Sequence, residues 1–196
     1  MPPRIPPLSP KAWPPEMREA LAALTPPNAR FSPPARDPDR PRGLNVLGTL
    51  AQHPALARAY HTFNGHLLFA TTIEPREREL LVLRVAAVRG ARYEWVQHVV
   101  LAGDVGLSDD EVAAIAVGAD APGWSPLDAA LLRAVDELLA EAEITDATWA
   151  TLAGAFDIRQ LMDIVFTVGA YDALAMAFKS FRVDLDDDLR KWDSQF

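Results

Sequence analysis

The sequence has 196 residues, 49% of them hydrophobic, and a formal net charge of −8 at pH 7. A chain of this length can bury one hydrophobic core, so a single domain with an extended arm is expected. The acidic charge argues against nucleic acid and anionic membranes as partners, because both would repel it. The chain contains no cysteine, which excludes disulfides and thiolate metal sites and is consistent with a reducing compartment.

The first ten residues hold several prolines and lack the apolar segment of a signal peptide. No stretch approaches the roughly 20 uninterrupted apolar residues that cross a membrane. The sequence therefore predicts a soluble, cytoplasmic protein.

Residues 1–43 are predicted to form a proline-rich arm, since 13 of the 17 prolines lie there. One short helix should interrupt the arm, because a proline pair presets its first turn and apolar residues then recur at helical spacing. The arm is either disordered or lies along the domain or a neighbouring subunit. The second arrangement is favoured by its apolar anchors, which are Ile5, Leu8, Trp13 and Phe31.

Residues 44–183 show a continuous helical pattern without a convincing strand, so we expect an all-α bundle of about six to eight helices. The helices are expected over residues 45–51, 54–70, 75–88, 93–102, 108–117, 125–142, 145–156 and 157–181. The last of these has too many apolar residues to cover on one side, which predicts burial between the core and another subunit. Residues 184–196 form an acidic tail, whose residues 184–188 are interpreted as solvated surface.

Residues 77–98 are the part of the sequence most suited to chemistry. Residues 77–88 are predicted to form a buried helix, because residues 80–88 are apolar on all sides apart from Arg84, and Gly90 then interrupts the run. In the next helix, Glu94 and His98 are four residues apart and therefore project from nearly the same face.

A carboxylate raises the pKa of a neighbouring imidazole and burial lowers it, so His98 could exchange protons near neutral pH. Glu94 is expected to orient His98 and to set its protonation. Glu79 can reach the same pocket if the two helices fold back on each other at Gly90, which would give a Glu, Glu, His cluster. The alternative is a surface or capping pair without chemistry.

Three segments, residues 76–81, 93–98 and 106–112, resemble the carboxymuconolactone decarboxylase family, which also contains the AhpD-like alkylhydroperoxidases. The resemblance covers roughly Asn45 to Gly118 and, more loosely, the helices up to Phe181. It implies an AhpD-like helical bundle and oligomers, commonly trimers or hexamers.

In the peroxidase branch of this family, the second helix begins with two cysteines three residues apart. Those positions correspond to Ala91 and Glu94 here, and the family's Glu and His correspond to Glu79 and His98. Without cysteine the chain has neither the nucleophile nor the resolving thiol of that branch. The sequence instead resembles a cysteine-less subgroup with the pattern Tyr-Glu-Trp-x-x-His.

Two arginines near the predicted pocket, Arg84 and Arg92, could hold a substrate carboxylate through paired hydrogen bonds. Arg84 could equally be an internal partner of Glu79 or Glu94. Four aromatic residues are expected to wall the pocket or to pack the core; they are Phe63, Tyr93, Trp95 and Tyr171.

These residues predict a cofactor-independent lyase or isomerase that acts on a small carboxylated or lactone-like organic acid. His98 would transfer the proton, Glu94 would orient it and Glu79 would assist as an acid or base. No metal is expected, although the spacing of Glu94 and His98 could place two ligands on one ion. The alternatives are a non-catalytic oligomeric binding or scaffold protein, and an alkylhydroperoxidase, which the missing thiols disfavour.

Overall fold

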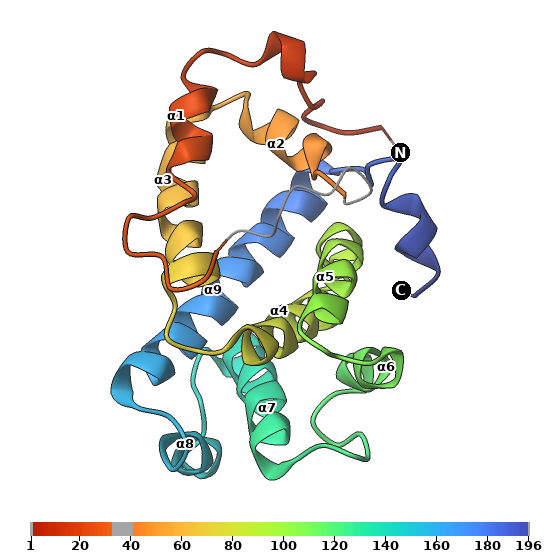
Figure 1. Ribbon diagram of the computed structural model, residues 1–196. Helices are drawn as coiled ribbons and strands as arrows, with labels where there is room; N and C mark the ends of the chain where they lie inside the picture. Colours follow the sequence, from red (N-terminus) through yellow and green to blue (C-terminus); the bar gives the residue numbers. More distant parts are fainter. Residues whose placement is uncertain (1, 33–40, 196) are drawn as a thin grey trace. The chain divides into compact units, whose positions relative to one another are not determined.

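A computed structural model describes residues 2–32 and 41–195 of the chain (Figure 1). The part of the predicted arm between residues 33 and 40 lies outside these described residues. Within them the regular structure is helical and no strand occurs, which confirms the all-α fold class. Nine α-helices are described, one of which lies in the arm and eight of which lie beyond residue 43.

The helices belong to two compact units, which are described separately. The first comprises Met1–Thr71 and Phe178–Lys191, and the second comprises Thr72–Ala177 and Trp192–Phe196. The first unit contains η1 (Pro10–Ala12), α1 (Met17–Ala22), α2 (Leu44–Leu50), α3 (Pro54–Gly65) and the π-helical turn η2 (His66–Ala70). The second contains α4 (Pro75–Arg89), α5 (Arg92–Asp104), α6 (Asp109–Val117), α7 (Pro126–Glu141), α8 (Asp146–Ala153) and most of α9 (Ile158–Phe181). The 3-10 helix η3 (Arg190–Gln195) spans the boundary between the two.

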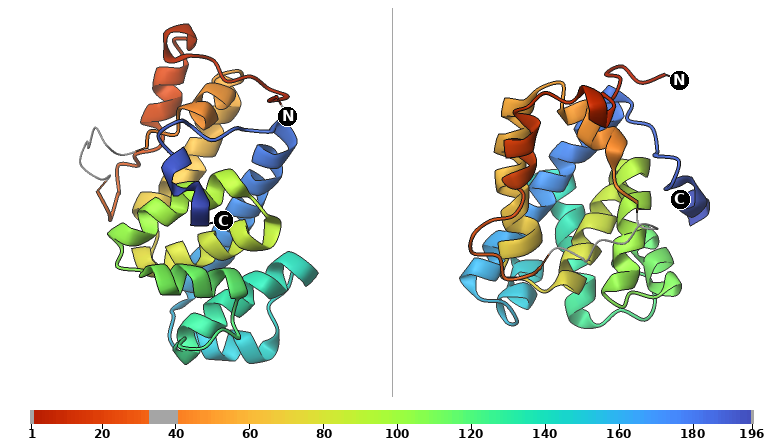
Figure 2. Two further views of the ribbon diagram at one scale, coloured as in Figure 1. Left: turned by 90° about the vertical axis from the view of Figure 1, so that its right-hand side faces the viewer. Right: turned by 45° about the horizontal axis from the view of Figure 1, so that its top comes forward.

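In the first unit, α1 and α3 lie side by side, as both views of Figure 2 show. The buried His61 of α3 joins them, because its Nδ1 donates to the carbonyl oxygen of Ala20 at 2.9 Å. Two predicted anchors of the arm, Leu8 and Trp13, pack against the buried core of this unit. The described arm is therefore held by apolar contacts.

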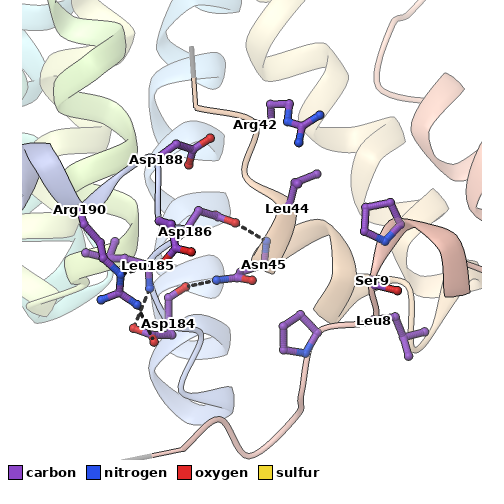
Figure 3. A pocket seen from close by; sticks show the side chains of 13 residues that line it. Leu8, Ser9, Arg42, Leu44, Asn45, Asp184, Leu185, Asp186, Asp188 and Arg190 are labelled. Carbon is purple, nitrogen blue, oxygen red and sulfur yellow. Dashed lines mark hydrogen bonds and ion pairs between the residues drawn. The ribbon is translucent and has the colours of Figure 1, made fainter. Parts of the chain in front are cut away.

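The solvated surface predicted at residues 184–188 is confirmed for Asp184, Asp187 and Asp188, which are exposed, and is wrong for Leu185 and Asp186. Asp186 is buried and its Oδ1 accepts from the backbone nitrogen of Asn45 at 2.9 Å, while Asn45 Nδ2 donates to the carbonyl oxygen of Asp184 at 3.0 Å (Figure 3). Leu185 and Leu189 are also buried. Helix α2 begins one residue earlier than predicted, and Gly43, in a left-handed conformation with φ of 63°, takes the N-cap position before it. An open hollow of about 550 Å³ lies between this segment, the arm and the start of α2.

In the second unit, α4 is the central helix and contacts α5, α6 and α7. Eight of its residues are buried, in agreement with the apolar run in the sequence. Arg76 in its first turn pairs with Glu111 of α6 at 2.7 Å and with Asp128 of α7 at 2.8 Å, so it ties the starts of three helices together. The capping box predicted at Ser108 and Glu111 is present.

One face of α9 carries large apolar side chains that remain exposed, namely Ile158, Met162, Phe166 and Met176. By length and composition α9 could cross a membrane, and 44% of its most apolar window is buried within the protein. A core helix of a soluble protein passes the same test. The helix also contains Asp163, which accepts hydrogen bonds from Thr72.

We expect Gly48→Ala to destabilise the first unit. A Cβ at Gly48 would lie closer than van der Waals contact to the carbonyl oxygen of Leu8 and to Pro7 Cβ. The two segments are held together there because the backbone nitrogen of Leu8 donates to the carbonyl oxygen of Gly48. Overpacking of this kind costs about 1–3 kcal/mol, to be measured by thermal or urea unfolding. Gly103→Ala is the matched control, because no atom lies within 4 Å of the position that its Cβ would occupy. There, loss of the flexible glycine should stabilise α5 by about 0.5–1 kcal/mol. Equal effects of the two changes would contradict the predicted contact.

Candidate active site

The turn between α4 and α5 brings together residues that are far apart in the sequence. Gly90 adopts the left-handed conformation with φ of 58°, and the backbone nitrogen of Ala91 donates to the carbonyl oxygen of Ala86 at 2.8 Å. This conformation costs glycine little, because it has no Cβ. The two helices fold back on each other, and Glu79 meets His98 nineteen residues later.

Glu79 lies at the centre of a buried chain of three side chains. Its Oε1 accepts from Arg78 Nε at 3.2 Å and from Arg78 Nη2 at 3.1 Å, and its Oε2 lies 2.7 Å from His98 Nδ1. Burial alone would raise the pKa of Glu79, but the charges and hydrogen bonds of His98 and Arg78 outweigh it, so the pKa is lowered. Glu79 is therefore an ionised acceptor.

His98 is partly exposed at one end of this chain. Its side chain is 9% exposed and that of Arg78 at the other end is 11% exposed, whereas that of Glu79 is fully buried. The ring also meets Tyr171 of α9 edge to face, with 5.1 Å between the ring centroids. Because Glu79 is ionised, it accepts a hydrogen bond from the N–H at Nδ1 of His98. In the neutral ring the lone pair is then on Nε2. The site thus presents an oriented imidazole base.

Glu94 differs from its predicted role. Sequence reasoning assigned it the orientation of His98, but the hydrogen bond to His98 comes from Glu79. Both carboxyl oxygens of Glu94 are buried without a hydrogen-bond partner. Helix spacing puts Glu94 and His98 on one face, whereas only the packing of α4 against α5 decides which acid reaches Nδ1.

Glu94 is held in its neutral form by its surroundings. Burial raises its pKa well above 4.5, and the negative charge of Asp172 raises it further. Asp172 itself stays paired with Arg89, whose Nε lies 2.6 Å from Asp172 Oδ1. The start of α5 would favour an anion at this position by about 0.3–1 kcal/mol. Burying an unpaired carboxylate costs several kcal/mol, so the neutral acid is preferred.

Two further buried polar atoms without a partner were missed by sequence reasoning. They are Gln97 Oε1 on α5 and Thr167 Oγ1 on α9. Gln97 follows Glu94 by three residues, and Thr167 precedes Tyr171 by one helical turn. Each unsatisfied buried polar atom costs about 1–3 kcal/mol unless water or a ligand bonds to it. A polar residue inside an apolar run was the available signal for both.

The two arginines expected to bind a substrate carboxylate are engaged elsewhere. Arg84 pairs with Asp136 through Nε at 2.7 Å and Nη2 at 3.0 Å, and its Nη1 donates to the carbonyl oxygens of Ile115 and Ala116. It therefore closes the end of α6 and contacts neither Glu79 nor Glu94 through these bonds. Arg92 pairs with Asp193 near the C-terminus.

The predicted aromatic residues are placed unequally. Tyr171 contacts the imidazole of His98, and Tyr93 and Trp95 are buried in α5. Phe63 lies on α3 in the first unit and is 39% exposed. That Phe63, Tyr93 and Trp95 line a substrate pocket stays a prediction. Among the described residues, no three His, Asp or Glu side chains are grouped so that they could hold a metal ion.

The helical arrangement is that of AhpD-like proteins. A protein of unknown function from Agrobacterium tumefaciens, described as a putative antioxidant defence protein AhpD, is 22% identical with a TM-score of 0.65 over 70% of this chain and 94% of that chain. A peroxidase-related AhpD-core protein from Ralstonia eutropha is 19% identical with a TM-score of 0.67 over 84% and 96%. The debrominase Bmp8 is 14% identical with a TM-score of 0.74 over 97% and 96%. At these identities the likeness concerns the fold alone.

Residues 54–137, from the start of α3 into α7, match the carboxymuconolactone decarboxylase family. This match over part of the chain and the AhpD-like fold confirm the resemblance predicted from the sequence. A search of curated proteins gave no match.

Replacing Arg84 by Lys should lower stability without changing the site. Lysine keeps the charge but cannot make the paired bonds to Asp136 while also reaching both carbonyls of α6. We expect a loss of about 2 kcal/mol in the free energy of unfolding. Arg133→Lys is the control, because Arg133 and its partner Asp120 are exposed and such pairs contribute about 0–1 kcal/mol. A large effect on ligand binding with unchanged stability would return Arg84 to a substrate role.

Glu94 should make the protein less stable as the pH rises. A carboxyl group whose pKa is raised on folding stabilises the folded state below its ordinary pKa, and this contribution is lost as pH rises through the raised value. The melting temperature of wild type should therefore fall relative to that of Glu94→Gln between about pH 5 and pH 9, with Glu94→Gln the more stable at the alkaline end. Parallel curves for the two proteins would show that Glu94 is already ionised.

Proposed function

We propose that this protein is a cofactor-independent lyase or isomerase that transfers protons on a small organic molecule. The observation that carries the proposal is the hydrogen-bonded chain of Arg78, Glu79 and His98, in which a fully buried carboxylate orients a partly exposed imidazole. An imidazole held in one tautomer by a buried carboxylate is a typical general base.

In the proposed mechanism His98 Nε2 removes a proton from the substrate. The imidazolium that forms is stabilised by the ionised Glu79, which Arg78 in turn holds in place. His98 then returns the proton to a different atom of the substrate, or to the leaving group. Glu79 orients the ring and remains ionised throughout, so it is a positioning residue and His98 is the catalytic residue.

A small-molecule substrate is supported by the fold neighbour Bmp8, which has been solved with 2,3,4-tribromopyrrole. The carboxylate part of the expected substrate is less well supported, because Arg84 and Arg92 are in ion pairs of their own. Thiol-dependent peroxidase chemistry has no nucleophile here, because the sequence contains no cysteine.

The non-catalytic alternative is a scaffold in which the same chain satisfies buried polar groups. It is favoured by the low exposure of His98 and by its bond to Glu79. The two functions differ in one respect: a base exchanges protons with a ligand, whereas a structural histidine does not.

Proton exchange into deuterium oxide tests the proposal without knowledge of the natural substrate. A panel of small unsaturated acids, lactones and ketones is incubated with wild type, and loss of C–H signals is followed by NMR. His98→Ala and Glu79→Gln should lower the exchange rate roughly 10²- to 10⁴-fold. Added imidazole should restore exchange in His98→Ala but not in Glu79→Gln.

Circular dichroism serves as the control for folding of each variant. A folded His98→Ala protein that exchanges as fast as wild type would remove the proposed mechanism. If wild type exchanges no compound of the panel, the scaffold function is favoured instead.

We also propose that the exposed face of α9 packs against a second copy of the chain. Exposed large apolar side chains at helical spacing are joined there by Gly169, beside which no atom lies within 4 Å, so another helix can approach closely. Met162→Lys should reduce the mass measured by light scattering, whereas Arg133→Glu, on α7 and with a half-exposed side chain, should leave it unchanged. A monomeric wild type would contradict the proposal.

A further inference from the structure

The polar atoms around Glu94 define what kind of ligand the site can accept. Glu94 Oε1 and Oε2, Gln97 Oε1 and Thr167 Oγ1 are all buried without a hydrogen-bond partner. Glu94 and Gln97 are neighbours on α5. Thr167 lies one turn from Tyr171, whose ring contacts His98. These atoms therefore belong to α5 and α9, the two helices that meet at the His98 and Tyr171 rings.

The charges that face Glu94 already have partners. On α4, Arg78 pairs with Glu79 and Arg89 pairs with Asp172 of α9. On α5, His98 bonds to Glu79. A carboxylate entering this region would meet the negative charges of Glu79 and Asp172 while both arginines are engaged. An anionic ligand is therefore disfavoured by charge.

We infer that the proton-transfer site binds a neutral group that carries a hydrogen-bond donor next to a carbonyl, such as a carboxamide, a lactam or an α-hydroxy ketone. Its N–H or O–H donates to Gln97 Oε1 and to the carbonyl oxygen of Glu94. Its carbonyl accepts from the hydroxyl proton of Glu94, and Thr167 Oγ1 donates or accepts as the ligand requires. This inference rests on the proposed function and names its substrate class.

The arrangement gives a balanced reaction without a further reagent. His98 Nε2 takes a proton from the carbon or heteroatom next to the carbonyl as the electron pair of that bond moves toward the carbonyl oxygen. Glu94 gives its proton to that oxygen, which produces the enol or imidic tautomer. Nothing is oxidised or reduced. The site is restored when His98 releases its proton to solvent and Glu94 takes up a proton from solvent.

Matched pairs of ligands test the inference directly. Crotonamide and crotonate share a carbon skeleton and differ in charge and in hydrogen-bond donors, as do cinnamamide and cinnamate. Binding to wild type is measured by ligand-observed NMR at neutral pH. We expect each amide to bind at least about tenfold more tightly than its carboxylate, because loss of a matched hydrogen bond in a buried site is costly.

Variants show which atoms hold the amide. Gln97→Leu and Thr167→Val should each weaken its binding about fivefold or more, since each removes one hydrogen bond. Thr151→Val is the control, because Thr151 is an exposed threonine of α8 that bonds to Ala147 O. Glu94→Asp, which shortens the acid, should weaken binding, and Glu94→Gln should retain it because the amide keeps one donor and one acceptor.

The outcomes separate the inference from the proposed function. Amide binding that survives in His98→Ala, together with lost proton exchange, supports both. Preferential amide binding without exchange in any protein supports the ligand class and refutes the catalysis. Three results would overturn the inference whatever the exchange assay shows. The carboxylates could bind as tightly as their amides, the amides could fail to bind to wild type and to every variant, or amide binding could be unaffected by Gln97→Leu and Thr167→Val.

Discussion

The bond between His98 Nδ1 and Glu79 Oε2, at 2.7 Å, is the interaction on which the site depends. It requires α4 and α5 to fold back on each other at Gly90, and it requires Arg78 to compensate a carboxylate that is fully buried. An uncompensated charge at this depth would be severely destabilising. The ion pair and the histidine bond make an ionised Glu79 tolerable, and they fix the orientation of the His98 ring.

The two acids of the site differ in charge because their surroundings differ. The pKa of Glu79 is lowered because a cation and an imidazole are its neighbours. The pKa of Glu94 is raised by its burial and by the negative charge of Asp172. A difference of this kind between the pKa values of two carboxyl groups lets a protein site provide an acid and a base at the same pH. In this chain the acid occupies the position that corresponds to a cysteine in the peroxidase branch of the family, so a proton donor stands where a nucleophile would be.

The arginines illustrate how much of the site could be predicted from the sequence. Arg84 interrupts an apolar helix next to the predicted pocket, and that position favoured either substrate binding or pairing with Glu79 or Glu94. Its actual partner, Asp136, lies 52 residues further along on α7, and its other bonds close the end of α6. Side-chain partners across helices follow from the packing of the helices, which local spacing does not contain. Gln97 and Thr167 were missed for the same reason.

The sequence by itself determined the helical class, most helix boundaries, the buried character of α4 and the turn at Gly90, because these follow from periodicity, capping residues and glycine conformation. It also determined the presence of Glu79, Glu94 and His98 in adjoining helices. Only the tertiary structure decided that Glu79 rather than Glu94 bonds to His98, since the two acids are distinguished by the rotation of α5 against α4. It alone decided that Leu185 and Asp186, within the predicted solvated surface at residues 184–188, are buried, because the partner of Asp186 lies some 140 residues earlier in the chain.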